Sequence, residues 1–260
     1  VGQLNAPPRH GENSWPPVGR KDGHQWGEPM AVRGEKPTAI DSVMAIEPGD
    51  RLIRLARENL GGEGDVEFVN SSLEDAPLPR ERFQAVFSAS AMHWVDPDLG
   101  WRKAADALVP GGTLALIQHF GCSDPRSTDD QRALLGAIAK VAPELAASWP
   151  TYREIKAILT GVHERRGNVS EVWSRLGDYD LARDYAADLF EDVQIAAVPR
   201  LVEHTADELG ALLGTMSFWS RLSPQQRTAI GDENQALYER LGQPIRSSIL
   251  ACAVTARRAA

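Results

Sequence analysis

Short apolar runs that alternate with stretches of helical spacing constrain this chain most, and they begin at residue 43. Val43 to Ile46 is a continuous apolar run that ends at Pro48-Gly49, a pattern typical of a strand buried on both faces and followed by a turn. Apolar residues then recur at helical spacing up to Leu60. Further strands are predicted at Val66 to Val69, Phe83 to Phe87 and Thr113 to Ile117, and a helix at Leu99 to Leu108. This alternation predicts an α/β fold with a parallel sheet covered by helices on both faces.

The remaining chain divides into a helical part and a mixed part. Residues 127–189 carry a mainly helical pattern, which predicts a helical insert or lid on a core formed by residues 43–126. Residues 190–260 are expected to complete that core, with two late strands that pair antiparallel at the sheet edge. The predicted helices are Asp129 to Val141, Tyr152 to Leu159, Ser170 to Leu176, Leu181 to Leu189, Ala206 to Leu213 and Pro224 to Leu241, and the late strands are Phe190 to Val198 and Ser248 to Ala256.

Residues 1–42 have a different texture from the rest. Residues 5–42 hold 6 Pro and 5 Gly but only four aliphatic or Met residues, with a period of neither 2 nor 3.6. Such a stretch buries too little apolar surface to offset its ordering entropy. We therefore predict that residues 1–42 form an atypical, disordered segment.

Composition excludes several classes of function. The 36 acidic residues outnumber the 28 basic ones, so the formal charge of -8 leaves no excess of Lys and Arg to bind nucleic acid. No apolar run approaches the roughly 20 residues of a membrane-spanning helix, and we expect a cytoplasmic protein. Cys122 and Cys252 lie far apart without a CxxC or His-rich context, so neither a disulfide nor a zinc site is predicted.

An acidic residue lies at the end of the first predicted strand. Ligands of an open parallel sheet bind beyond the carboxyl ends of its strands, where a carboxylate can accept hydrogen bonds from both hydroxyls of an adenosine ribose. Glu47 is placed to do this. The alternative interpretation is a solvated turn carboxylate before Pro48.

Four segments follow one another in an order and spacing that carry a family resemblance. They are Ala45-Ile46-Glu47-Pro48-Gly49, Val69 to Leu78, Phe83 to Trp94 and Leu108 to Leu114. Together they resemble a class I S-adenosylmethionine-dependent methyltransferase of the type 11 small-molecule branch, over most of residues 43–120. The resemblance implies a Rossmann-like, doubly wound and mostly parallel sheet with a helical insert and an antiparallel C-terminal edge strand. It also implies S-adenosylmethionine as the cofactor and a small molecule as the methyl acceptor.

The resemblance assigns cofactor contacts to residues at three strand ends. Glu47 would hold the ribose, while Ser72 and Leu73 would lie against the adenine. Ser72 stands where the family often has an acid, and a hydroxyl accepts a hydrogen bond without charge, which implies weaker cofactor binding. Ser88 and Ala89 follow the strand whose end faces the methyl-transfer position, where small residues let cofactor and acceptor approach.

Three larger side chains are candidates for the acceptor side. Trp94 would face the substrate, because an aromatic ring attracts a sulfonium cation, although a Trp in such a segment is also typical of core packing. His119 ends the strand Thr113 to Gln118 on the ligand-bearing edge, where a neutral imidazole could remove a proton from a hydroxyl or amine. We take His119 as the first general-base candidate and His93 as the second.

The family's first strand and its Gly-rich turn are not found in this sequence. Val1-Gly2-Gln3-Leu4 is similar only to the tail of that turn, which makes Gly2 a further cofactor-binding candidate. Residues 5–42 stand where the family has its first helix, so the first strand and the Gly-rich motif are interpreted as missing or replaced. Loss of a central strand would leave its neighbours with unpaired backbone groups and exposed apolar faces.

Three functions therefore stay open. The first is methyl transfer from S-adenosylmethionine to a small molecule, which needs alignment and a dry cavity more than any fixed catalytic residue. The second is a methyltransferase remnant without catalysis, or a binding module derived from one. The third is a nicotinamide-dependent oxidoreductase that uses the same acidic residue for its ribose.

Overall fold

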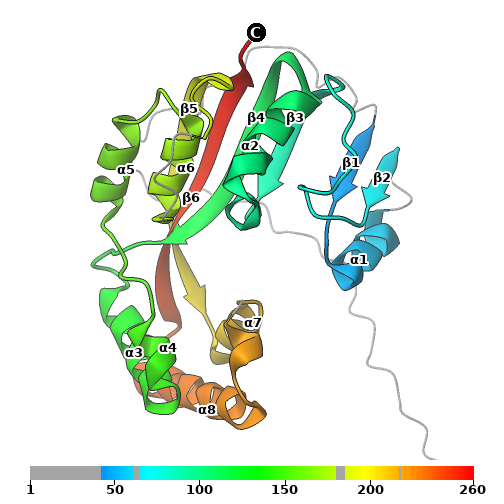
Figure 1. Ribbon diagram of the computed structural model, residues 1–260. Helices are drawn as coiled ribbons and strands as arrows, with labels where there is room; N and C mark the ends of the chain where they lie inside the picture. The colour runs from blue at the N-terminus through cyan, green and yellow to red at the C-terminus, as the bar shows by residue number, and fades with distance from the viewer. Residues whose placement is uncertain (1–41, 61–64, 180–184, 217) are drawn as a thin grey trace, which may run out of the picture. The chain divides into compact units, whose positions relative to one another are not determined.

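The computed structural model describes residues 42–60, 65–179, 185–216 and 218–260, and it arranges their strands in two sheets (Figure 1). A two-stranded sheet consists of β1 (Val43–Ile46) and β2 (Val66–Val69). A four-stranded sheet has the order β3-β4-β6-β5, from β3 (Phe83–Ala89), β4 (Leu108–Gly121), β6 (Ile245–Arg258) and β5 (Phe190–His204). The predicted α/β class is confirmed.

The strand directions agree in part with those predicted from the sequence. β1 pairs parallel with β2, and β3 pairs parallel with β4. β6 runs antiparallel to both β4 and β5, which confirms the predicted antiparallel pair of late strands. The strand at the edge is β5, however, while the last strand lies inside the sheet. Parallel pairing is divided between two sheets because no described strand connects β1 with β3.

Most predicted helices are present with close to their expected limits. The described helices are α1 (Asp50–Leu60), α2 (Pro97–Ala107), α3 (Thr128–Val141), α4 (Pro143–Ala147), α5 (Ile155–His163), α6 (Val169–Gly177), α7 (Ala206–Gly214) and α8 (Pro224–Leu241), with 3-10 turns η1 (Met92–Trp94) and η2 (Trp219–Arg221). The helix predicted at Tyr152 begins only at Ile155. No helix in the described part of the chain is long and apolar enough to cross a membrane.

One predicted helix is wrong where it can be compared. Of the segment predicted as a helix from Leu181 to Leu189, residues 181–184 lie outside the described residues. Residues 185–189 form bends and turns that lead directly into β5. Ala186 is fully buried and the Leu189 carbonyl accepts from the Ala259 N–H at 3.0 Å, so tertiary contacts fix this segment and override its helical spacing.

Two apolar clusters hold the folded part together. The larger combines residues of α2, β4, α5, α6, β5 and β6 around the fully buried Trp173. The second joins α3, α7 and α8. Capping boxes at Thr205 and Ser223 begin α7 and α8 by satisfying backbone donors of their first turns. Asp130 of α3 and Arg246 of β6 form an ion pair, 2.9 Å from Oδ2 to Nε, that ties the second cluster to the sheet.

The strands expected to be buried on both faces are not. Phe87 of β3 is 71% exposed and Val43 of β1 is 41% exposed. Each of these strands has a single hydrogen-bonded neighbour in the described residues, so one edge and part of each face are uncovered. The apolar face of α1 is also open, since Ile53 is buried while Leu52 and Leu55 are exposed. Exposed apolar faces of this kind are what loss of a neighbouring strand implies.

Candidate cofactor and acceptor site

The turn at the end of β1 is held by its own side chains. The Gly49 N–H donates to Oε1 of Glu47 at 2.7 Å. Asn70, just after β2, donates from Nδ2 to the carbonyl oxygens of Glu47 at 3.0 Å and Pro48 at 3.2 Å. Glu47 is therefore partly buried in a fixed turn rather than a freely solvated carboxylate. Its second oxygen, Oε2, has no hydrogen-bond partner within the described ranges.

The segment after β2 forms a second turn. The Ser72 hydroxyl donates to Oδ2 of Asp75 at 3.1 Å and accepts from the Asp75 N–H at 3.2 Å. The hydroxyl predicted to face the adenine is thus engaged in its own turn, and the adjacent Leu73 is half-buried. Without a change of partner, Ser72 retains only weak acceptor capacity for a ligand.

Sequence reasoning missed two residues that organise this edge, Asn70 and Glu74. The Glu74 carboxylate accepts from the Asp96 N–H at 2.8 Å, and the Glu74 carbonyl accepts from Nζ of Lys103 at 2.6 Å. The hydrogen bond from Asp96 lowers the pKa of Glu74. These contacts tie the loop after β2 to α2, which follows β3. The only signal in the sequence is a polar residue soon after a strand end, which is too common to be specific.

The last residues of β3 and the segment that follows it present small and aromatic side chains. Ser88 is half-buried and Ala89 is exposed. Ser90 adopts a left-handed conformation, with φ of 51°, and its N–H donates to the Ile117 carbonyl at 2.9 Å, which turns the chain into η1. Trp94 is 71% exposed, so the core-packing interpretation of this residue is wrong. Its ring centroid lies 5.2 Å from that of His93.

His93 lies in a cluster of polar and aromatic side chains. Its ring stacks on Tyr179, with centroids 5.0 Å apart and planes at 8°. Gln118 of β4 donates from Nε2 to the Tyr179 hydroxyl at 2.6 Å. Burial lowers the pKa of His93, and the Gln118 side chain acts in the opposite direction. Burial also raises the pKa of Tyr179. Burial therefore favours the neutral imidazole, the state in which it can accept a proton.

His119 does not join this cluster. It is an exposed residue in the regular part of β4, next to Gln118. Successive side chains of a strand point to opposite faces, so His119 projects away from the face on which Gln118 meets Tyr179. Of the two histidines proposed as bases, only His93 lies among groups that orient it. Gly2, proposed as a cofactor contact, lies outside the described residues.

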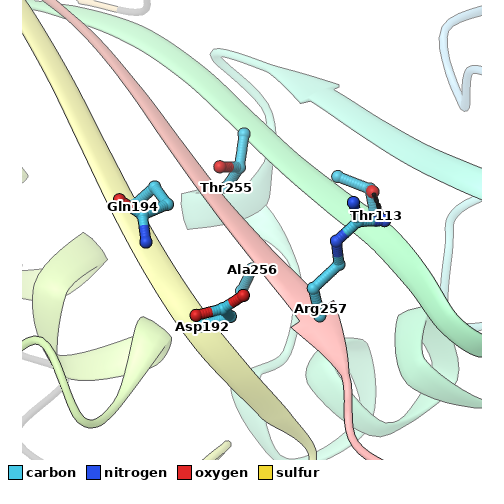
Figure 2. A pocket seen from close by; sticks show the side chains of 6 residues that line it. All are labelled: Thr113, Asp192, Gln194, Thr255, Ala256 and Arg257. Carbon is cyan, nitrogen blue, oxygen red and sulfur yellow. Dashed lines mark hydrogen bonds between the residues drawn. The ribbon is translucent and has the colours of Figure 1, made fainter.

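Two cavities lie away from these residues. The first, of about 220 Å³, is lined by Thr113, Asp192, Gln194, Thr255, Ala256 and Arg257 (Figure 2). It adjoins the beginning of β4, the opposite end from the one that carries Gln118. The second, of about 40 Å³, lies between the first residues of β1, β2 and β3. Neither is lined by Glu47 or His93, so neither is a ready-made cofactor site.

Comparison with known proteins confirms the family resemblance over most of residues 43–120. Residues 30–116 match the model of the family described as Methyltransferase domain (Methyltransf_11). The match begins within the segment 1–42 and ends in β4. Over this range the chain is similar to the methyltransferase domain family. The matched range includes Glu47, Ser72, Ser88 and His93.

Individual relatives are more distant. A protein named methyltransferase from Claviceps purpurea is 39% identical over 70 residues, which cover 26% of this chain and 22% of that protein. The solved YcgJ protein of Bacillus subtilis is 16% identical, with 85% of this chain and 83% of that chain covered and a TM-score of 0.43. A geranyl diphosphate methyltransferase solved with S-adenosylmethionine is 16% identical, with 84% and 68% covered and a TM-score of 0.33.

Proposed function

We propose that this chain binds S-adenosylmethionine beside the turn at Glu47 and transfers its methyl group to a small-molecule acceptor near His93. The observation that carries the proposal is the methyltransferase-family match over residues 30–116, which contains both residues. The polar turns after β1 and β2 and the His93 cluster after β3 support it, because all three follow the carboxyl ends of parallel strands, where ligands of such sheets bind.

The residues present fit the nucleoside part of this cofactor. Glu47 offers a carboxylate whose Oε1 is fixed by Gly49 and whose Oε2 is left to accept from a ribose hydroxyl. Asn70 holds the turn in place without occupying that carboxylate. Ser72 would contribute little to adenine binding unless it exchanges its partner Asp75. S-adenosylmethionine, when bound, supplies a methyl group on a sulfonium, a leaving group that is already activated.

The chain's own part in the reaction is alignment and proton removal. A hydroxyl or amine acceptor that places its proton at His93 would lose that proton to the neutral imidazole as its lone pair attacks the methyl carbon. His93 would become an imidazolium in this step, while the sulfonium of the cofactor would supply the leaving group that keeps the electron pair. The exposed Trp94 ring beside His93 would line the acceptor side.

Calorimetry with S-adenosylhomocysteine tests the proposal on the full chain. We expect binding by the native chain, and about 10-fold or greater weakening by Glu47→Gln, because a hydrogen bond to a charged group is lost. Glu67→Gln is the matched control, since Glu67 is an exposed residue of the neighbouring strand. No heat from the native chain at millimolar ligand would refute cofactor binding, and equal weakening by both variants would refute the role of Glu47.

A second candidate function is a methyltransferase-derived fold that binds no cofactor. The specific observation in its favour is the division of the parallel strands into two sheets, with β1 and β3 each open along one edge. The position between two such edges is where a central strand would complete the sheet. The same titration separates the candidates, because only the first predicts saturable heat that depends on Glu47.

A further inference from the structure

Tyr179 contacts both His93, through ring stacking, and Gln118, through a hydrogen bond, although the three residues come from distant parts of the chain. His93 lies in η1 after β3, Gln118 in β4, and Tyr179 just after α6. We propose that Gln118 is a positioning residue that fixes the tautomer of His93: its Oε1 accepts from Nδ1–H, which leaves Nε2 of His93 with the lone pair. Tyr179 fixes the amide so that its oxygen is the end available to the imidazole.

His93 and Gln118 each have one buried polar atom without a hydrogen-bond partner. Nδ1 of His93 and Oε1 of Gln118 are both buried and both lack a hydrogen-bond partner. A buried acceptor without a donor is unfavourable, and so is a buried donor without an acceptor. The Gln118 side chain lies close enough to the ring to raise the pKa of His93, so a protonated Nδ1 and the amide oxygen can satisfy each other. With Nδ1 unprotonated, two acceptors would face each other and both would remain unpaired.

Tyr179 determines which end of the Gln118 amide is free. Nε2 of Gln118 donates to the Tyr179 hydroxyl at 2.6 Å, so the nitrogen is occupied and the oxygen is left. If the amide were reversed, Tyr179 would donate to the oxygen and Nδ1 of His93 would accept from the nitrogen. That arrangement gives the opposite tautomer, with the proton on Nε2. The tautomer therefore reports directly on the amide orientation.

The environment of the ring makes the tautomer consequential. Stacking on Tyr179, with 8° between the ring planes, opposes rotation of the imidazole. Burial favours the neutral ring, and only a neutral ring has a choice of tautomer. After Nε2 takes a proton, Nδ1–H becomes a stronger donor to the amide oxygen, which stabilises the imidazolium. This last consequence rests on the proposed function, whereas the tautomer itself does not.

Nitrogen NMR of the imidazole rings in the full chain tests the inference without cofactor, because protonated and unprotonated ring nitrogens resonate far apart. At a pH where His93 is neutral, we expect Nδ1 protonated and Nε2 unprotonated. Gln118→Met removes the acceptor at similar length and should shift His93 to the Nε2–H form that solvated histidine favours. Unlike Gln118→Met, Gln118→Glu keeps an acceptor at this position. It should therefore keep the Nδ1–H form and raise the pKa of His93. Tyr179→Phe retains the stack and should give a mixture.

The controls separate a local effect from misfolding. His204, which contacts the Ser247 hydroxyl at 3.0 Å on β5 and β6, should keep its spectrum in every variant. Trp173 also has a buried, unpaired Nε1, and Trp173→Phe should leave the His93 tautomer unchanged if the amide oxygen pairs with His93. An Nε2–H form in the native chain, or a tautomer that Gln118→Met does not alter, would overturn the inference. Absence of cofactor binding would leave it standing.

Discussion

The two edges of the four-stranded sheet are built very differently. β5 carries Pro199, the charged Arg200 and a register shift at Asp192, whose φ is 58°. Proline, charge and bulges are the usual means by which natural sheets prevent pairing with other chains. β3 reads Phe-Gln-Ala-Val-Phe-Ser-Ala, with neither proline nor charge. Its pairing with β4 shifts register near its first residues, between Phe83 and Ala85, and most of Phe87 is exposed. The composition of β3 is therefore that of an interior strand, although it lies at an edge.

The contrast extends to the elements beside each edge. β5 and its neighbours enclose the larger apolar cluster, with Trp173 fully buried. The pair β1 and β2, with α1, buries Ile53 but leaves Leu52 and Leu55 exposed. Apolar burial is thus concentrated from η1 and α2 onward, while the proposed cofactor turn at Glu47 belongs to the sparsely covered part. Substitutions in both parts of the molecule test this division.

The largest effect is expected from two tryptophans of opposite burial. Trp173→Ala should lower the free energy of unfolding by about 3–5 kcal/mol, because it leaves a large cavity in the main cluster. Trp94→Ala, at a residue 71% exposed, should change it by no more than about 0.5 kcal/mol. Urea unfolding followed by circular dichroism measures both. Similar losses in the two variants would contradict the division.

The next effect concerns the ion pair between α3 and β6. Asp130 accepts from the backbone N–H of Arg246 at 2.9 Å as well as from its guanidinium, and it is 2% exposed. Asp130→Asn keeps the volume but loses the charge, so we expect a loss of about 1–3 kcal/mol at neutral pH. The neighbouring, exposed Asp129→Asn is the control and should cost much less.

The same pair predicts a pH dependence. Hydrogen bonds from Arg246 lower the pKa of Asp130, so its unfolded-state value of about 3.9 lies above the folded one. Its stabilisation is fully present above the unfolded pKa and is lost as the pH falls through the folded pKa. The difference in unfolding free energy between the native chain and Asp130→Asn should therefore shrink below about pH 4. A difference that stays constant there would show that the charge of Asp130 contributes little.

Much of the local structure could be predicted from the sequence, because single elements have local signals. Val43 to Ile46 and Val66 to Val69 are the observed β1 and β2, and Pro224 to Leu241 is the observed α8. Strand composition could not show that β1 and β3 lie at open edges, since edge position depends on which strands are present beside them. The helix predicted from Leu181 to Leu189 is wrong over residues 185–189 for a related reason. Helical spacing does not reveal competing tertiary contacts.

The candidate site was predictable only where a motif is contiguous. Glu47 and His93 lie in segments of the family resemblance, and both are ordered by neighbours that the sequence did not identify. Gln118 gave no signal because its partner Tyr179 lies 61 positions further along the chain. His119 is the first base candidate from the sequence, but the alternation of side chains in β4 places it on the face opposite to Gln118.

The two edges of the four-stranded sheet can also be tested directly. Phe87→Lys places a charge on the unprotected edge strand, so it should reduce concentration-dependent association of the native chain while changing the free energy of unfolding by about 0.5 kcal/mol or less. Val198→Lys, at an exposed residue of β5, is the matched control and should leave association unchanged. Sedimentation velocity over a range of concentrations measures both. If Val198→Lys had the larger effect, the assignment of protected and unprotected edges would be reversed.

The smallest effect is expected at His93, where the open and covered parts meet. Burial depresses its pKa below the unfolded value of about 6.5, so folding disfavours the imidazolium. Stability from this group is therefore present above the unfolded pKa and is lost as the pH falls through the folded pKa. Relative to His93→Phe, the native chain should lose a small amount of unfolding free energy on acidification below about pH 6.5. Tyr179→Phe should behave like the native chain because it retains the ring that buries His93. If the native chain instead gains stability relative to His93→Phe in this range, the His93 ring is solvated or paired with an acid. His93 would then not belong to the covered part of the molecule.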